Sequence, residues 1–407
     1  MKEIRHSSTF KPISVPVEND VSKDNWDRVQ SFSLATTQPT EKVYEIGRLN
    51  KVCSDKDILE AALSISQFEY GKIDSFLQLA GKDSEPVAGL TLSDFDDPRT
   101  DFYSPGKEEF GGAIEQTLWA QHMALDSFGL SISANEKLER TFDLSGEYAK
   151  VCRKGNKYLI FVENDAPSGT VGNYVIDVSD PAPVVDPNNA GVYILDLWRI
   201  RSGVATQLSL TDYTYDNVAE EITIVSGATG DNYRIWYTAA SYGSAGDPEV
   251  INDADKCYLK AENVTVTIDD GTHTAVELDK LTSLSIAVTL NRNVKGKIGT
   301  IDKFKDVESK DVTISLENYV KDSIVQEVLM QQAGQDWGII DFSLFGSVDV
   351  VVKIYQEAAK TNFLIGYKST DMDFTSETES FDANSFGSNP LELASDNLLI
   401  STDVGNL

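Results

Sequence analysis

The strongest constraint on the fold is a segment order that occurs twice in the 407-residue sequence. In the later copy, an alternating stretch at residues 284–288 precedes a long polar arm, a second alternating stretch at 312–316 and apolar residues at helical spacing over 324–329. Alternation of apolar and polar residues indicates a half-buried strand, whereas apolar residues three and four positions apart indicate a helix. The order strand, arm, strand, helix therefore describes one folding unit.

An earlier copy of this order spans residues 29–81. Without a gap, Ser31, Ser33 and Lys51 align with Ser283, Ser285 and Lys303. A one-residue slip after the arm then aligns residues 63–65 with 314–316. A third similarity lies further along the chain and pairs Phe142-Asp143 and Leu159-Ile160 with Phe381-Asp382 and Leu399-Ile400. The shared order predicts an internal duplication.

The composition changes between the two copies. Residues 163–246 contain frequent Pro, Gly, Asn and Asp turn clusters separated by short apolar stretches, a pattern typical of a small β-sandwich of immunoglobulin-like size. Residues 117–133 fit either a helix or a strand, and the prolines around residues 13–17 favour an edge strand or an arm lying on a neighbour. We therefore predict a mainly β chain with three domains: a first unit at 1–162, an inserted sandwich at 163–250 and a second unit at 251–407.

Charge and cysteine usage limit the function classes. The formal net charge is -30, so a basic surface that holds nucleic-acid phosphates is not expected. Cys53, Cys152 and Cys257 lie far apart and indicate isolated thiols in a protein made in a reducing compartment. The first residues lack the apolar stretch of a signal peptide, and no run of eighteen apolar residues occurs. We therefore expect a soluble chain without a membrane partner.

No catalytic motif stands out. The three histidines, His6, His122 and His273, are far apart, and nucleotide-binding, zinc-protease and nucleophile-elbow motifs are missing. We therefore predict no enzyme activity, no catalytic residue, no cofactor and no metal. The aromatic residues of the middle domain leave two alternatives, a sugar-binding platform or a packed core; these residues are Trp198, Trp236 and Tyr237.

The duplicated stretches resemble the tail-tube proteins of long-tailed bacteriophages. The matching segments are SLSIAVTLNRNVKGKIG with KDVTISLENYV in the later copy, and SFSL, YEIGRLNKV and LEAALSISQFEYG in the earlier copy, with SISANEKLERTFDLSGE matching the late strands. The resemblance covers the two units and not the middle domain. It implies β-sandwich or barrel units, each with a short helix, that form rings, and a long arm that reaches the adjacent ring. A chain with two units implies three chains in a pseudo-six-fold ring.

The arms at residues 37–57 and 289–307 are the predicted assembly interface, because they are long, polar and rich in lysine, whereas hairpin loops usually have about two to five residues. Their lysines would complement an acidic ring face. The predicted ring-stacking residues are Tyr44, Gly47, Arg48, Lys51, Arg292, Lys295, Lys297, Gly299 and Lys303.

The partners implied by the resemblance are other copies of this chain and the tape-measure, tail-completion and possible sheath proteins of the tail. DNA would pass through the lumen without specific binding, and the protein would reside in the virion tail after assembly in the host cytoplasm. The inserted sandwich would lie outside the tube and be separable from it. Two alternatives stay open: another virion or secretion-apparatus component (baseplate, sheath or capsid), or a carbohydrate-binding adhesin acting through the middle domain.

Overall fold

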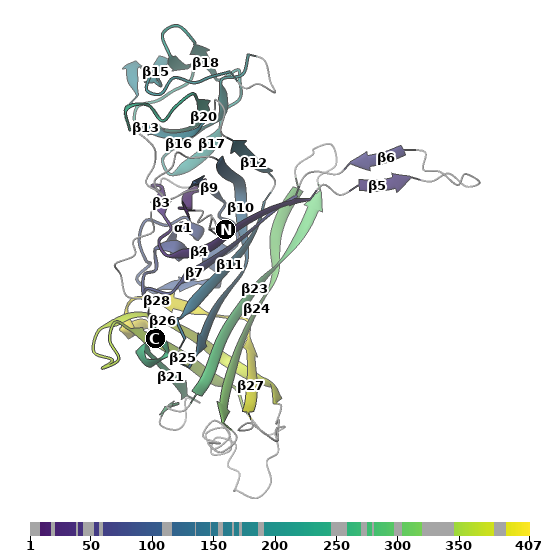
Figure 1. Cartoon of the computed structure of the whole chain (residues 1–407), viewed down its shortest axis with the longest axis vertical. Coiled ribbons are helices and arrows are strands. Elements are labelled where there is room, and N and C mark those ends of the chain that lie inside the picture. The colour runs from purple at the N-terminus through teal and green to yellow at the C-terminus, as the bar shows by residue number, and fades with distance from the viewer. Residues whose placement is uncertain are drawn as a thin grey trace, which may run out of the picture.

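The computed structural model describes most of the chain: residues 9–17, 21–37, 40–43, 53–56, 60–107, 116–134, 136–146, 148–153, 158–164, 167–170, 173–185, 191–245, 259–269, 275–278, 281–296, 303–319, 346–377 and 388–407. These residues form an elongated molecule with three tiers (Figure 1). The inserted domain lies at one end, the first unit in the middle and the second unit at the other end. Strands dominate, so the prediction of a mainly β chain is confirmed.

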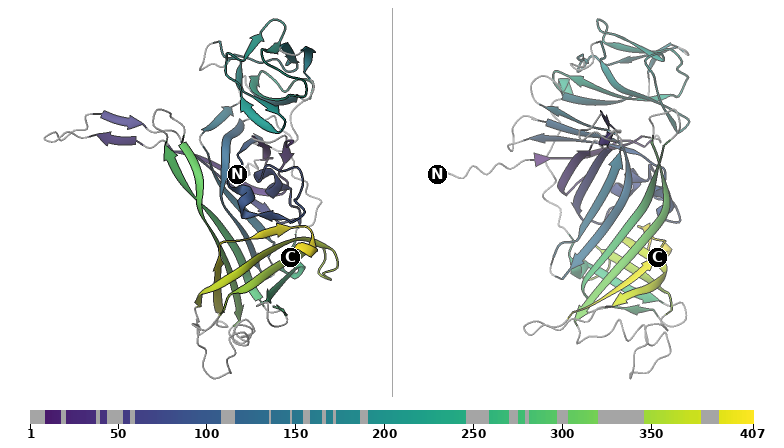
Figure 2. Two further views of the ribbon diagram at one scale, coloured as in Figure 1. Left: turned by 180° about the vertical axis from the view of Figure 1, so that it is seen from behind. Right: turned by 90° about the vertical axis from the view of Figure 1, so that its right-hand side faces the viewer.

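One antiparallel sheet runs through both units, and its strands cross the molecule diagonally (Figure 2). Its order is β4 (Val29–Thr37), β7 (Glu60–Phe68), β11 (Glu139–Gly146), β10 (Gln116–Ser133), β23 (Leu281–Gly296), β24 (Lys303–Tyr319), β27 (Ser388–Ser395) and β26 (Phe363–Glu377). The first four strands come from the first unit and the last four from the second. The two units therefore meet where β10 pairs with β23, and we call this pairing the central seam.

Each unit adds an outer group of strands, because the first halves of β10 and β26 pair with strands outside the shared sheet. In the first unit these strands are β1 (Thr9–Phe10), β2 (Ile13–Pro16), β3 (Asp24–Asn25), β9 (Thr100–Lys107) and β12 (Tyr148–Arg153). In the second unit they are β21 (Val264–Asp269), β22 (Val276–Glu277), β25 (Val348–Tyr355) and β28 (Leu399–Ser401), to which the first unit adds β8 (Leu90–Thr91).

The prediction of an edge strand near residue 13 is wrong. β2 has β3 on one side and β9 on the other, and all four of its residues are buried. Proline is compatible with this position because, among the described residues, β3 pairs only with Ile13 and Ser14, so that Pro16 has a paired strand on one side alone. Residues 117–133, for which the sequence left helix and strand open, form β10.

The core of both units lies between the shared sheet and the outer strands. The predicted helix of the first unit is present as α1 (Asp74–Leu79), and its Phe76 packs edge-to-face on Phe128 and Phe142. The helix predicted near residues 324–334 lies outside the described residues. Short 3-10 turns complete the two units at η1 (Leu92–Phe95), η3 (Ala261–Asn263) and η5 (Val404–Asn406).

The duplication predicted from the sequence is visible in the strand register. Ser33 lies opposite Ser64 in the first unit, as Ser285 lies opposite Ser315 in the second. Both pairings are interrupted by a β-bulge at the same aligned place, before Ser31 and before Ser283. A bulge is a specific local feature of a strand pair, so its recurrence supports a common architecture.

The third sequence similarity is wrong in detail. Asp143 lies opposite Ser64, and the residue opposite Ser315 is Glu392, so the counterpart of Phe142-Asp143 is Leu391-Glu392. Residues 381–382, which the sequence had paired with them, lie outside the described residues. Acidic and apolar residues alternate in both places, and the pattern alone did not distinguish them.

The inserted domain consists of two four-stranded sheets. One has the order β13 (Tyr158–Asn164), β20 (Asn232–Ala239), β16 (Ile194–Arg201), β17 (Val204–Gln207); the other has β14 (Ser168–Thr170), β15 (Asn173–Asp177), β19 (Glu221–Ile224), β18 (Tyr213–Asp216). A short turn, η2 (Gly243–Ala245), follows β20. The expectation that residues 158–162 close the first unit is wrong, because they belong to β13 and pair with β20. An apolar strand beside a domain boundary has the same pattern whichever sheet receives it.

The inserted domain shares a small core with the first unit. Trp236 of β20 is 1% exposed and packs against Trp119 and Tyr103, with ring centroids 4.9 and 5.2 Å away. The guanidinium of Arg234 is buried and donates to the carbonyls of Pro16 and Val21. The expectation of a separable decoration must therefore be revised, since its removal would expose large aromatic side chains of the first unit.

Candidate functional site

The most extensive surface feature is the polar face of the shared sheet. One cross-strand row of side chains passes over all eight strands, and the residues at each step are short or small. The row is Ser31, Ser66, Thr141, Gly129, Ala287, Thr313, Ala394 and Asp373. Neighbouring rows add further serine and threonine residues together with Asp and Glu, so the face presents hydroxyl groups, methyl groups and carboxylates.

Carboxylates are the charged groups on the described part of this face. No Lys or Arg is found among the described side chains that point to this face from eight segments of the sheet. These segments are residues 31–37, 62–66, 127–133, 139–145, 283–291, 311–317, 373–376 and 392–394. Acidic side chains on the same strands include Asp143, Asp311, Glu317 and Glu392. Because affinity for nucleic-acid phosphates comes mainly from cations, a polyanion close to this face would be repelled or would slide past it.

Serine–carboxylate pairs hold the acidic groups against the sheet, and one pair recurs in both units. Ser127 Oγ donates to Asp143 Oδ2 at 3.1 Å, and Ser376 Oγ donates to Glu392 Oε2 at 2.8 Å. The register makes these the same pair, since each serine follows an equivalent bulge and faces an equivalent carboxylate. The duplication therefore extends to the chemistry of the polar face.

Arg292 fastens the central seam. Its Nε donates to the carbonyl of Leu125 at 2.9 Å, and its terminal nitrogens donate to the carbonyls of Phe95 and Asp96, each at 2.7 Å. Asp126 lies 3.5 Å from Nε as an ion pair, and the arginine side chain is 3% exposed. Burial, followed by the charge of nearby Arg99, lowers the pKa of Arg292. Its charge holds the two units together inside one chain.

The outer strands of the shared sheet are β4 at one end and the final residues of β26 at the other. Within the described residues, β4 pairs only with β7, and residues 373–377 of β26 pair only with β27. An exposed sheet edge presents backbone donors and acceptors that can pair with another chain. These two edges are the candidate contact points between copies.

Most of the predicted ring-stacking residues cannot be compared with the structure. Tyr44, Gly47, Arg48, Lys51, Lys297 and Gly299 lie outside the described residues. Lys295 and Lys303 occupy the described backbone of β23 and β24, close to the tip where these strands pair. Arg292 is the one predicted residue with a described side chain, and it bonds within its own chain.

Both predicted arms are two-stranded ribbons that leave the body of the molecule (Figure 1). In the first arm, β5 (Thr40–Val43) pairs with β6 (Cys53–Lys56). In the second, β23 and β24 stay paired as far as Gly296 and Lys303. The described part of each arm is therefore a pair of hydrogen-bonded strands and not an irregular loop.

A buried polar cluster joins the two units beneath the sheet, and sequence reasoning missed it. The carboxylate of Glu69 forms an ion pair with Arg140 and accepts a hydrogen bond from Tyr367 of the second unit at 3.2 Å. Glu69, Arg140 and Tyr367 are each at most 1% exposed. Burial by itself would lower the pKa of Arg140, but the charge of Glu69 and the nearby hydroxyl groups of Tyr367 and Tyr70 together outweigh it, and the pKa is raised. These residues are distant in sequence, so no local pattern could reveal them.

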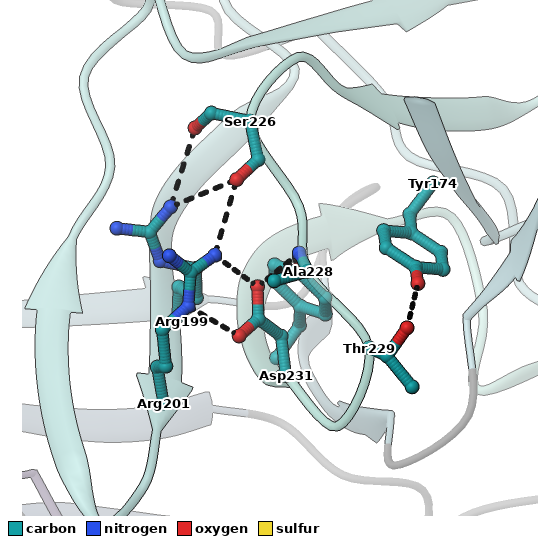
Figure 3. A network of polar contacts seen from close by, with 8 residues as sticks. Tyr174, Arg199, Arg201, Ser226, Ala228, Thr229 and Asp231 are labelled. Carbon is teal, nitrogen blue, oxygen red and sulfur yellow. Dashed lines mark hydrogen bonds and ion pairs between the residues drawn. The ribbon is translucent and has the colours of Figure 1, made fainter. Parts of the chain in front are cut away.

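The polar groups of the inserted domain are used to fix its own loops. Arg201 forms a two-point ion pair with Asp231, with both distances 2.7 Å, and Arg199 donates to Ser226 in the loop between β19 and β20 (Figure 3). Two of the three aromatic residues considered for a sugar-binding platform, Trp236 and Tyr237, are at most 1% exposed and therefore cannot contact a sugar at the surface. The core alternative is therefore correct for these two residues.

The described residues offer no grouping of His, Cys, Asp and Glu side chains suited to a metal ion. In the same part of the chain, no helix has the length and apolar character needed to cross a bilayer. The acidic residues of the polar face are spread along the strands, and their described partners are neighbouring hydroxyl groups and, for Asp311, the side-chain amide of Asn291.

No protein-family model and no curated protein matches this sequence. Among solved structures, the chain is similar to the cap of the anti-feeding prophage, described as its tube-terminating cap, with 21% identity, a TM-score of 0.27 and coverage of 39% of this chain and 98% of the other. It is also similar to the anti-feeding prophage baseplate in its 6-fold symmetrised structure, with 14% identity, a TM-score of 0.25 and coverage of 34% and 92%. Neither likeness assigns a function by itself.

Proposed function

We propose that this protein is a structural subunit of a phage tail, in which copies assemble into stacked rings around a conduit for DNA. The observation that carries the proposal is the shared sheet, in which two equivalent units already pair edge to edge as neighbours in a ring would. Its polar face has the chemistry of a conduit wall, since small hydroxyl groups and carboxylates resist adhesion of a polyanion.

The central seam provides a template for contacts between copies. In that seam Ser127 of β10 lies opposite Thr289 of β23. The counterpart of Ser127 in the second unit is Ser376, and the counterpart of Thr289 in the first unit is Thr37. If the same pairing recurs between chains, β26 of one copy lies beside β4 of the next, with Ser376 opposite Thr37. A heterologous contact of this kind generates a ring when its rotation closes, and with two units per chain a pseudo-six-fold ring contains three chains.

A disulfide experiment tests this pairing. Opposite residues on adjacent antiparallel strands have Cβ atoms about 4.5–5.5 Å apart, close enough for a disulfide after small adjustments. The double variant Thr37→Cys with Ser376→Cys should cross-link under oxidation into species that end at a closed trimer on a non-reducing gel. The control is Ser31→Cys with Ser376→Cys, which keeps the thiol on the same face of β4 but six residues out of register. Equal cross-linking in both, or a ladder that continues to six chains, contradicts the proposal.

The chemistry of the conduit wall can be tested separately. Ser33→Lys with Ser285→Lys places a cation at the same position of both units, on the polar face. Wild-type assemblies should leave DNA unbound at 150 mM salt, whereas assemblies of the variant should retain it in a salt-dependent manner. A pair of exposed substitutions on the inserted domain, Val204→Lys with Val218→Lys, controls for net charge. DNA retention by wild-type assemblies would overturn the proposed role of this face.

Ring stacking is the proposed role of the arms. Lys295→Glu, Lys297→Glu and Lys303→Glu together should leave rings intact and prevent their stacking, because like charges would then meet at an acidic ring face. Electron microscopy distinguishes rings from tubes directly. Tubes of normal length in this triple variant would remove the arms from the stacking mechanism.

A further inference from the structure

The outer strand β12 of the first unit has an exposed apolar residue, Val151, at a place where the counterpart strand of the second unit is covered by a further strand. Within the described residues, β12 pairs with β10 and with no second strand. Its counterpart β28 pairs with β26 on one side and with β8 on the other. The two units therefore differ at one equivalent edge.

The register identifies the equivalent residues. His122 of β10 and Asp371 of β26 are both in the left-handed backbone region and mark the same position in the two units. Leu118 lies four residues before His122, and Tyr367 lies four residues before Asp371. Leu118 is opposite Val151 of β12, and Tyr367 is opposite Ile400 of β28, so Val151 and Ile400 are counterparts.

These counterparts have opposite environments. Ile400 is 0% exposed, and Leu90 of the neighbouring strand β8 lies beside it and is also fully buried. Val151 is 50% exposed. The difference arises because the first unit supplies β8 to the second unit, whereas no described strand of the chain takes the equivalent place beside β12.

The position of β12 indicates which part of a neighbouring chain would supply a strand beside it. At the central seam the first unit contributes β10 and β8, and the second unit receives them on β23 and β28. The counterparts of the two receiving strands in the first unit are β4 and β12. β4 and β12 therefore lie on the side of the first unit that corresponds to the side of the second unit on which β23 and β28 pair with the first unit. β4 is also the edge strand at which the proposed ring closes.

We propose that β12 is a second, outer contact between copies of this chain, at which the second unit of a neighbouring copy adds a short strand and covers Val151. The proposal rests on the proposed ring and adds a partner surface to it. Each junction between chains would then contain two strand pairings, one on the conduit wall and one on the outer layer, as the central seam does.

A charge at Val151 tests this contact. Val151→Asp should weaken self-association by about tenfold or more, since it places a carboxylate where an apolar side chain is expected. Val204→Asp is the matched control, because Val204 is 65% exposed on β17 of the inserted domain and takes no part in the proposed contact. Val151→Ile, which copies Ile400, should assemble at least as well as wild type. Sedimentation velocity over a concentration series measures all three.

Hydrogen exchange of the wild-type chain provides a readout that does not depend on a variant. Amides of residues 148–153 should exchange more slowly in assembled protein than in the unassembled chain, whereas amides of 204–207 should not change. Equal exchange in both states, together with normal assembly of Val151→Asp, overturns the outer contact while a positive Thr37–Ser376 cross-link still supports the ring. Failure of the wild-type chain to self-associate at any concentration would overturn both proposals.

Discussion

The two units share backbone geometry while the residues at equivalent places differ. In the first unit, left-handed His122 donates its backbone N–H to Asp101 at 2.8 Å; in the second, left-handed Asp371 donates to Asp349 at 3.1 Å. Asp101 is 2% exposed because the inserted domain lies over it, whereas Asp349 is partly exposed. Both units therefore share the left-handed residue and its backbone hydrogen bond to an aspartate. The electrostatic environment of that aspartate differs, because it depends on which part of the molecule covers it.

The units differ more at the groups that bind them together. Among the described residues, the ion pair of Glu69 and Arg140 has no equivalent in the second unit, where the register places Asn389 at the position of Arg140. Arg292 of the second unit aligns with Thr40 of the first. Strong charge-assisted contacts are therefore concentrated at the junction inside the chain, which must persist before any ring forms.

The largest expected effect follows from breaking the buried ion pair. Arg140→Met should lower the free energy of unfolding by about 3–5 kcal/mol, because it leaves the carboxylate of Glu69 buried without its cation. Glu69→Gln with Arg140→Met should recover part of that loss, since no unpaired charge remains. Tyr367→Phe removes one hydrogen bond and should cost about 1 kcal/mol. Urea unfolding measures these differences, and a change below 1 kcal/mol for Arg140→Met would mean that the cluster does not hold the units together.

A smaller loss is expected at the central seam. Arg292→Met removes the donors to three backbone carbonyls and should cost about 2–4 kcal/mol. Lys310→Met is the control on the neighbouring strand, because its ion pair with Asp96 is partly exposed and should contribute less than about 1 kcal/mol. Faster amide exchange of residues 283–291 in the arginine variant would locate the damage at the seam. Equal losses in the two variants would show that Arg292 has no special role there.

Asp101 should make the stability of the first unit depend on pH. Burial, partly opposed by His122, raises the pKa of Asp101 to about 6. The folded state then binds a proton that the unfolded state has released, so stability is highest below about pH 4 and falls as pH rises to 6, by up to about 3 kcal/mol. Asp101→Asn keeps an oxygen that accepts from His122 N–H and should flatten this region of the profile. Thermal unfolding between pH 4 and 7 checks the sign, and a wild-type profile that rises over this range would contradict it.

The smallest expected effect concerns the left-handed residues themselves. Asp371→Gly should be neutral or stabilising by less than about 1 kcal/mol, because glycine adopts a positive φ without steric cost. His122→Gly should be destabilising instead, since the imidazole packs edge-on against Trp198 with 5.4 Å between ring centroids. Opposite signs for the two variants would confirm that only the backbone geometry is shared. The same sign in both would place the side chains in equivalent roles.

Several elements could be predicted from local sequence. Alternation identified both copies of the strand, arm, strand order, and the one-residue slip aligned Ser64 with Ser315, as the register has it. The predicted order of the first copy, which ends with a helix, agrees with the position of α1. These features depend on residues near one another in the chain, so the physical causes are contained in short segments.

The sequence by itself determined a duplicated, β-rich, acidic chain with long arms, because alternation, turn residues and net charge are local or summed properties. Only the tertiary structure decided that the two units share one sheet, that β13 belongs to the inserted domain and that Arg292 closes the central seam. Each of these three features depends on which two strand edges pair. Strand edges pair through backbone N–H and C=O groups, which every residue except proline carries, so the local sequence does not identify the partner strand. The partnership of Glu69, Arg140 and Tyr367 has the same origin, since burial makes their charges depend on distant chain segments.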